Sequence, residues 1–354
     1  MYLPPGTFNE TYEKDMAIIR HKEHWTLIIV LAVVCFLLYL FGNNYILGIT
    51  NLIGISIISA LGLQILMGFA GQISVAQAAF MAVGAYASAI LATNGVPFWF
   101  SIIAASLMSG TIGLVFGWPS IRITGFYLVM STFAAQFIII YAINNVFTNL
   151  TRGTLGHPAP IPRFFWNFSV NTERKWFILI IFILAIATLT TANLKRTKGG
   201  RALIAIRDNA LAAEVMGISL WRYKLLAFFL CCSYAGMAGA LYAHWQGSVV
   251  GEAFDLMQSI WFLGYLIVGG MGSIPGCYFG VILIILLQEG LTQFSSVLVG
   301  VYPKATSLIA PTKPILFGVI VALFLIFEPK GLAHRWESFK TYYRSWPYPY
   351  ITKD

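Results

Sequence analysis

The sequence contains very few charged residues. Asp, Glu, Lys and Arg make up 10% of its 354 residues, whereas hydrophobic residues make up 58%. A soluble domain typically contains about 25% charged residues, and between Thr26 and Ile121 this chain has none. A water-soluble fold cannot cover its surface with such a composition, and a disordered chain would require the opposite one. The composition therefore excludes a soluble enzyme, a nucleic-acid binder and a secreted disulfide scaffold, and it indicates an integral membrane protein.

The apolar residues form solid runs, which are typical of membrane-spanning helices rather than of strands with alternating polarity. A helix that crosses a bilayer needs roughly 20 apolar residues, so we expect an all-α integral membrane protein, a polytopic helical bundle of about ten transmembrane helices. The predicted spans are 25–41, 45–66, 73–91, 98–118, 126–143, 176–191, 223–243, 257–271, 274–291 and 314–327. The predicted parts are a cytoplasmic N-terminal segment (1–24), helices one to six (25–193), a cytoplasmic loop (194–222), helices seven to ten (223–327) and a cytoplasmic tail (328–354).

Groups that commonly carry chemistry are scarce in the spans. The predicted spans lack the buried Asp, Glu, His or Arg of a proton relay or voltage sensor, and a GxxxxGK[ST] phosphate loop is absent from the sequence. The four cysteines lie in apolar segments and have the pattern of small core residues rather than of disulfides or metal ligands. The sequence therefore predicts a non-catalytic chain without a cofactor or metal of its own, whose energy source, if transport is driven, lies on another chain.

Polar residues interrupt the apolar sequence between the second and third spans. Residues 68–77 read GFAGQISVAQ, with two glycines and two amides. Non-helical backbone at membrane depth is tolerated where it lines a cavity or is buried in protein. The segment is either such a break or a short turn whose amides cap the next helix, and the residues favour neither interpretation.

The net charge of +9 collects mainly in the loop between spans six and seven. Its basic residues are Lys195, Arg196, Lys198, Arg201, Arg207, Arg222 and Lys224, as expected of a cytoplasmic loop. Within residues 199–217, apolar side chains recur every three or four positions, which predicts short amphipathic helices. A loop of this length is long for a connector, so it suggests a docking element for a cytoplasmic protein. The alternative is a basic helix resting on anionic lipid.

These segments resemble a known family. Residues 60–80 (ALGLQILMGFAGQISVAQAAF), 83–86 (VGAY) and 120–128 (SIRITGFYL) are similar to the early core of LivM-type permeases, the membrane subunits of branched-chain amino acid ABC importers. Residues 200–209 (GRALIAIRDN), 212–217 (AAEVMG) and 223–228 (YKLLAF) resemble the coupling loop of that family. Residues 269–276 (GGMGSIPG) and 328–332 (EPKGL) match its later motifs, so the resemblance runs in order over about residues 26–335.

The resemblance implies a role and partners. It implies a permease subunit in a bacterial inner membrane, with both termini cytoplasmic, together with a homologous second permease, two ATPases that use ATP and magnesium, and a periplasmic solute-binding protein. The residues that it places in contact with the ATPase are Arg207, Asp208, Asn209, Ala212, Ala213 and Gly217. Arg207 and Asp208 are expected to pair across that interface.

The solute and its path are less defined. A lumen with amides and hydroxyls but without charge suits a neutral or zwitterionic solute, and the pathway candidates are Gln72, Ser74, Gln77 and Gln136. Relatives with this general pattern serve branched-chain amino acids, urea or short amides, or aromatic acids. Residues 151–158 (TRGTLGHP) differ from the TGGPNG run frequent in the family, so the resemblance does not identify the solute. A self-contained channel or secondary carrier is the alternative from another functional class.

Overall fold

A computed structural model describes residues 35–121, 125–160, 163–164, 168–301, 306–328 and 331–345. The described chain is mostly helical. The long helices are α3 (Asn44–Leu63), α4 (Gln77–Thr93), α5 (Phe98–Gly117), α6 (Phe126–Tyr141), α8 (Glu173–Arg196), α11 (Leu220–Gln246), α12 (Leu256–Gly269), α13 (Ile274–Val301), α14 (Thr306–Phe327) and α15 (Leu332–Ser345). Two π-helices continue α3 and α6, namely η1 (Gln64–Phe69) and η3 (Ala142–Val146).

Shorter elements lie at the two ends of the bundle. At one end are α9 (Lys198–Asp208), α10 (Ala210–Val215) and the 3-10 turn η2 (Trp118–Ile121). The others are α7 (Thr148–Thr151), η4 (Gly153–Leu155), η5 (Gly251–Phe254), β1 (His157–Pro158), β2 (Arg163–Phe164), β3 (Phe168–Ser169) and β4 (Ser248–Val249). Strand β1 pairs antiparallel with β4, and β2 pairs antiparallel with β3.

Six of the described helices are long and apolar enough to cross a membrane. They cover Asn44–Phe69, Phe98–Gly117, Phe126–Val146, Glu173–Arg196, Leu220–Gln246 and Ile274–Gln293. Helix α4 is apolar but shorter. The predicted third span began near residue 73, whereas α4 begins at Gln77 and residues 70–76 are not helical. Much of the first predicted span, 25–41, lies outside the described residues.

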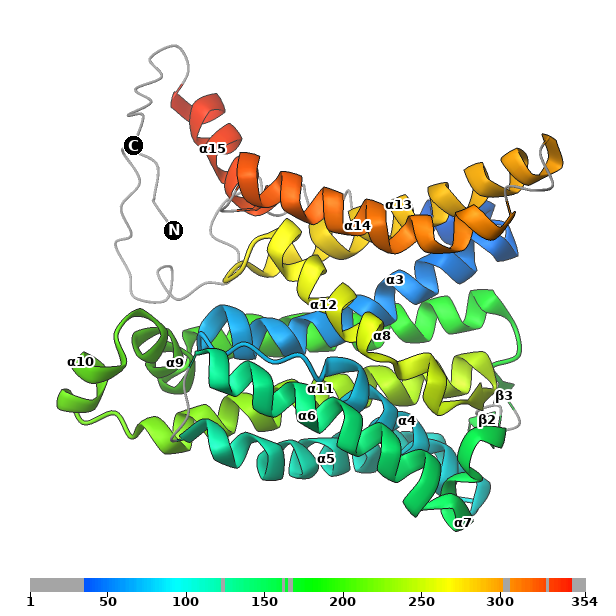
Figure 1. Ribbon diagram of the computed structural model, residues 1–354, viewed down its shortest axis with the longest axis horizontal. Coiled ribbons are helices and arrows are strands. Elements are labelled where there is room, and N and C mark those ends of the chain that lie inside the picture. The colour runs from blue at the N-terminus through cyan, green and yellow to red at the C-terminus, as the bar shows by residue number, and fades with distance from the viewer. Residues whose placement is uncertain are drawn as a thin grey trace.

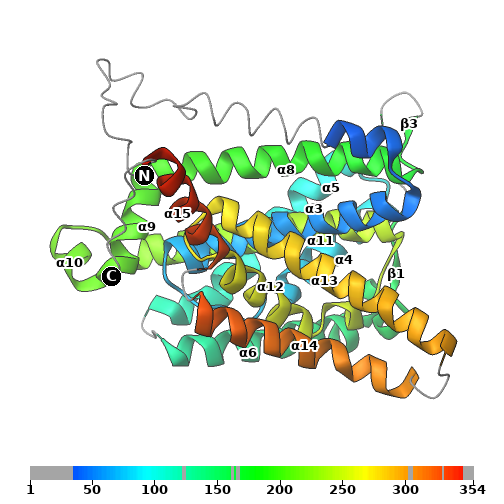
Figure 2. The ribbon, with the colours of Figure 1, turned by 90° about the horizontal axis from the view of Figure 1, so that it is seen from above.

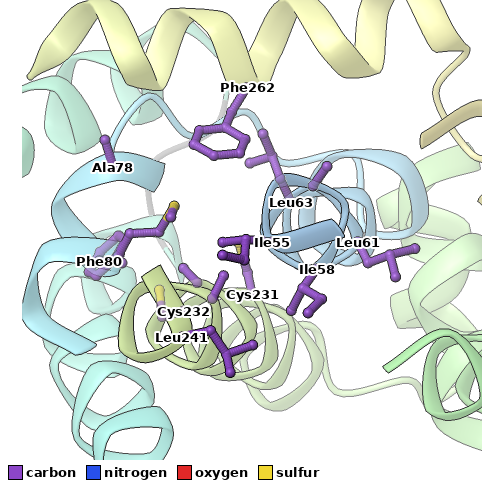
Figure 3. Packing of buried hydrophobic residues seen from close by; sticks show 14 of the residues in the cluster. Ile55, Ile58, Leu61, Leu63, Ala78, Phe80, Cys231, Cys232, Leu241 and Phe262 are labelled. Carbon is purple, nitrogen blue, oxygen red and sulfur yellow. The ribbon is translucent and has the colours of Figure 1, made fainter. Parts of the chain in front are cut away.

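Helix α11 lies at the centre of the bundle, where it packs against α3, α4 and α5 (Figures 1 and 2). Figure 3 shows the core between these helices, where Ile55 and Ile58 of α3 lie beside Cys231 of α11, and Phe262 of α12 points towards them. Contacts of this kind hold helices together in lipid, where apolar surroundings provide no hydrophobic drive for association.

Glycines allow the closest helix contacts. A Cβ atom on Gly84 of α4 would collide with the backbone of Gly236 of α11, and one on Gly113 of α5 would collide with Cys232. The glycines of the α12–α13 pair behave alike, since a Cβ on Gly280 would collide with the carbonyl of Tyr265. These glycines therefore let the paired helices approach each other at backbone distance.

Helices α12 to α15 form a second layer across the bundle (Figure 1). Helices α13 and α14 run side by side, and α12 connects them to α3 and α4. The cysteines Cys231, Cys232 and Cys277 are buried and unpaired by disulfides, in agreement with their prediction as core residues.

Candidate functional site

The segment between η1 and α4 turns back into the bundle. Residues 70–76 are not helical, and Gly71 adopts a φ of +68° at the turn. Gln72 and Ser74 are buried, whereas Ile73 is exposed. Gln77, the first residue of α4, donates from its side chain to the Ser59 carbonyl at 2.9 Å. Helix α4 therefore starts beside Ser59. Ser59 lies roughly 15 Å before the end of η1, at 1.5 Å per helical residue, so α4 begins inside the bundle.

The first N–H groups of α4 are bound by side chains from other helices. Ser259 of α12 accepts a hydrogen bond from the Ala78 N–H at 2.9 Å, and Gln136 Oε1 of α6 accepts one from the Ala79 N–H at 3.0 Å. Ser259 also donates to Gln136 Oε1 at 3.0 Å, and Gln136 Nε2 donates to the Phe254 carbonyl at 2.8 Å. The first N–H groups of a helix have no intrahelical hydrogen-bond partners. Here the side chains of Ser259 and Gln136 accept these hydrogen bonds in place of water.

Residues 70–76 therefore interrupt the helical backbone inside the bundle, and no amide of this segment caps α4. The cap of α4 is Ala76, without a side-chain bond, and the groups that bind the helix start are the Gln136 amide of α6 and the Ser259 hydroxyl of α12. Sequence reasoning missed Ser59, Thr132 and Ser259, whose only signal is a hydroxyl within an apolar run. Thr132 accepts from the Val75 N–H at 3.1 Å.

The four predicted pathway residues are all buried but do not form one cluster. Gln77 faces α3 and α11, where its Oε1 also accepts from Cys231 Sγ at 3.3 Å. Gln136 lies with Ser259 of α12, where both bind N–H groups at the start of α4. Gln72 is 5% exposed, and its Oε1 has no hydrogen-bond partner among the described residues. The structure therefore places polar groups around the start of α4 rather than along one groove.

The predicted coupling loop forms two short helices that extend beyond the end of the bundle (Figures 1 and 2). Each has its own N-cap: Thr197 Oγ1 accepts from the Gly200 N–H at 3.2 Å in α9, and Asn209 Oδ1 accepts from the Ala212 N–H at 3.0 Å in α10. Gly217 ends α10 with a φ of +83°, the conformation that glycine adopts at helix ends. Leu203 and Ile206 hold α9 against the bundle.

Helix α10 presents apolar side chains to the outside. Leu211, Val215 and Met216 are 76%, 87% and 81% exposed, respectively, and Ala212 is exposed beside them. Ala213 is buried. Clustered exposed apolar side chains outside a span mark an interaction surface.

Arg207 connects α9 to the segment that precedes α4. Its Nη1 donates to the Gly68 carbonyl at 2.7 Å, and its Nε and Nη2 donate to Asp208 Oδ1 at 3.0 and 2.8 Å. Arg207 and Asp208 thus pair with each other in this chain. The contact between Arg207 and Gly68 was not indicated by the sequence, because the two residues lie 139 positions apart.

Comparison with known proteins shows the family to which the chain belongs. Residues 45–327 match a protein family described as the branched-chain amino acid transport system / permease component. The chain belongs to this family. The match begins next to the first residue of α3 and ends at the last residue of α14, so it includes the α4 break, α9, α10 and the turn between α12 and α13.

Curated relatives agree with the family. The high-affinity branched-chain amino acid transport system permease protein LivM of Escherichia coli is 30% identical over 309 residues, covering 80% of this chain and 69% of the relative. LivM of Salmonella typhimurium is 29% identical, covering 78% and 67%. LivH of Escherichia coli is 26% identical, covering 62% and 76%. No solved structure gives a significant match.

Proposed function

We propose that the chain is the membrane-spanning permease subunit of an ATP-driven importer for branched-chain amino acids or a related neutral or zwitterionic solute. The observation that carries the proposal is the family match over residues 45–327. The absence of a phosphate loop from the sequence supports an energy source on a separate ATPase chain. In this proposal the permease does not hydrolyse ATP itself.

The proposed topology has about ten spans in a bacterial inner membrane, with both termini in the cytoplasm. The helices α4, α12 and α14 supply three spans beyond the six that meet the length and hydropathy requirement. The predicted span 25–41, much of which lies outside the described residues, is the tenth. The basic residues around α9 and α10 favour a cytoplasmic position for this end of the bundle. Residues 194–222 then form the cytoplasmic coupling loop.

The proposed ATPase contact is the outer surface of α10 and its neighbours, that is, residues 207–217. Leu211, Val215 and Met216 provide the apolar part of this surface, and Ala212 beside them allows close approach of a partner. Because the surface extends beyond the bundle, a soluble partner reaches it without entering the membrane. The match to both LivM and LivH permeases supports a pair of homologous permeases in one importer.

The proposed solute path passes the start of α4. Gln72 brings a buried carbonyl oxygen that has no hydrogen-bond partner among the described residues, and Gln136 and Ser259 lie at the positive end of the helix. These groups suit an uncharged or zwitterionic solute, because they offer hydrogen bonds and a partial positive charge without an ion.

Reconstitution tests the proposed function. The purified chain is placed in liposomes with and without its second permease, ATPase subunits and binding protein. We expect uptake of radiolabelled leucine or a related solute to require ATP and every subunit. Gradient-driven uptake by the chain alone would contradict the proposal and favour a self-contained carrier. Thermal shift of the binding protein with amino acids, urea and aromatic acids then identifies the solute.

A second experiment tests the ATPase contact. The double variant Leu211→Asp/Val215→Asp places charge on the exposed apolar surface, so we expect the ATPase subunits no longer to co-purify with the permease. Lys198→Asp is the matched control, since it changes the charge by the same amount at an exposed residue of α9 that lies outside residues 207–217. Equal ATPase recovery from the double variant and the control would place the docking surface elsewhere.

A further inference from the structure

The guanidinium of Arg207 lies where three separate segments meet. These segments are the end of α9, the connection between η1 and α4, and the turn between α12 and α13. The bond to Gly68 comes from Nη1, while the two bonds to Asp208 orient the planar group. All of the guanidinium nitrogens are therefore engaged within this chain.

Two further glycines make room for this side chain. A Cβ on Gly71 would lie 2.8 Å from Arg207 Cγ, and one on Gly272 would lie 3.2 Å from Arg207 Nη1. Gly71 has a φ of +68° and Gly272 one of +88°. We call Gly68, Gly71 and Gly272 the glycine cradle. Arg207 occupies a space that larger residues at Gly71 and Gly272 would fill.

The Gly68 carbonyl is a favourable acceptor for a cation. It belongs to the last turn of the continuous α3–η1 helix, whose final carbonyls lack intrahelical partners and carry the negative end of the helix dipole. A second cation is close, because Lys195 Nζ lies 5.8 Å from the centre of the Phe69 ring. A hydrogen bond from a charged donor is stronger than one between neutral groups, so Arg207 holds this helix end firmly.

The hydrogen bond between Arg207 and Gly68 also links the proposed ATPase contact to the proposed solute path at the start of α4. Asp208 ends α9, Asn209 caps α10, and the Gly68 side of the contact leads directly into residues 70–76 and the start of α4. Arg207 is two residues before Asn209, the N-cap of α10, so a displacement of α10 reaches it through Asp208 and Asn209. Helix η1 is a π-helix, a form that is frequent at functional sites.

We propose that Arg207 is a positioning residue that transmits movement of α10 to residues 70–76, and thereby to the start of α4. The inference rests on the proposed function, since it requires an ATPase to move α10. Arg207 contacts neither solute nor nucleotide in this scheme. It acts through the Gly68 carbonyl, and Asp208 keeps its guanidinium in the plane that this bond requires.

Transport by the complete importer in liposomes provides the first test. Without the charged hydrogen bond, we expect Arg207→Ala to lower both uptake and solute-stimulated ATP hydrolysis by about tenfold, with the subunits still assembled. Arg207→Lys keeps the charge but loses the planar pair with Asp208, so an intermediate rate is expected. Arg201→Ala removes the same charge from an exposed position in α9 and should behave as wild type.

Labelling of the segment itself separates transmission from a merely structural role. Ile73→Cys introduces a thiol at an exposed position in the segment, in a Cys35→Ser background that leaves only buried native cysteines among the described residues. The rate of labelling by a water-soluble maleimide is measured without nucleotide and with ATP plus vanadate. We expect the rate to depend on nucleotide in this background and to become independent of it when Arg207→Ala is added.

The outcomes distinguish the two proposals. Nucleotide-dependent labelling that persists in Arg207→Ala would overturn the role of Arg207 while leaving the importer intact. Uptake that does not require ATP in the wild type would overturn both. If Arg207→Ala fails to assemble, Arg207→Lys carries the same test, with a reduced nucleotide effect expected and an unchanged one contradicting the proposal.

Discussion

Helices α4 and α10 are both rich in alanine, yet they have opposite surroundings. Every residue of α4 from Gln77 to Ala89 is buried, whereas α10 exposes Leu211 and Val215 almost fully. In α4 the small residues let α11 approach its backbone closely. In α10, Ala213 is buried, but Ala212 is exposed beside Leu211 and Val215. An exposed apolar surface of this kind is unfavourable unless a partner covers it. The comparison teaches that one composition serves packing within the chain in α4 and, in the function proposed above, contact with another chain in α10.

Enlarging a small residue in α4 gives the largest expected effect. Gly84→Leu forces a side chain against the backbone of Gly236, which cannot move aside, so we expect a loss of at least about 3 kcal/mol and failure to fold. Gly290→Leu in α13 is the matched control, because a Cβ there meets no atom within 4 Å. Fluorescence-detected gel filtration measures the folded fraction. A monodisperse Gly84→Leu protein would show that α4 and α11 do not pack as described.

Enlarging the glycine at the end of α10 should affect transport rather than folding. Gly217→Trp meets no atom within 4 Å of its Cβ, but the indole blocks approach of the ATPase, so we expect uptake and ATPase stimulation to be lost. Gly95→Trp, in the α4–α5 turn, has the same open space and a similar φ, +86° against +83°. Both variants carry the same backbone strain, about 1–2 kcal/mol. Normal uptake by Gly217→Trp would remove this residue from the docking surface.

Removing the amide that binds the start of α4 should reduce stability to an intermediate degree. Gln136→Leu leaves the Ala79 N–H and the Phe254 carbonyl unpartnered, at a cost of roughly 2–4 kcal/mol. Gln246→Leu is the control, since Gln246 is exposed and its side chain donates to Tyr242 Oη at 3.3 Å. Thermal unfolding in detergent reports the difference. Equal melting temperatures for the two variants would mean that Gln136 does not support the helix start.

The smallest expected effect concerns the surface of α10. Leu211 is 76% exposed, so Leu211→Gln should change the free energy of unfolding by less than about 0.5 kcal/mol. Binding of the ATPase subunits, measured by co-purification, should nevertheless weaken because the apolar contact is smaller. A clear fall in melting temperature would show that Leu211 packs within the chain, and the contrast between α4 and α10 would then not hold.

Much of the helical framework could be predicted from local sequence. The predicted spans 98–118 and 126–143 agree with α5 and with α6 plus η3, because continuous apolar runs of this length leave few alternatives. The start of α4 was predicted too early. Glycines and amides at residues 68–77 signalled irregular backbone, but its extent depends on partners in α6 and α12 that are distant in sequence.

The candidate site was predicted less completely. Asn209 and Gly217 were selected through a family resemblance, and the structure gives them local roles as N-cap and helix end. Arg207 was also selected, but its bond to Gly68 was not. Local patterns report on neighbours within a few positions, whereas this contact depends on how α3, α9 and α12 pack together.

By itself, the sequence determined that the chain resides in a membrane, that it is helical and that it belongs to a permease family, because these properties follow from composition, run length and ordered motifs. Only the tertiary structure decided that α4 begins inside the bundle and that Arg207 lies in the glycine cradle. The physical reason is that hydrophobic burial is largely non-directional and can be recognised from residue type, whereas a hydrogen bond requires two groups at a defined distance and angle. For Gly68 and Arg207, separated by 139 positions, that distance exists only after the helices have packed.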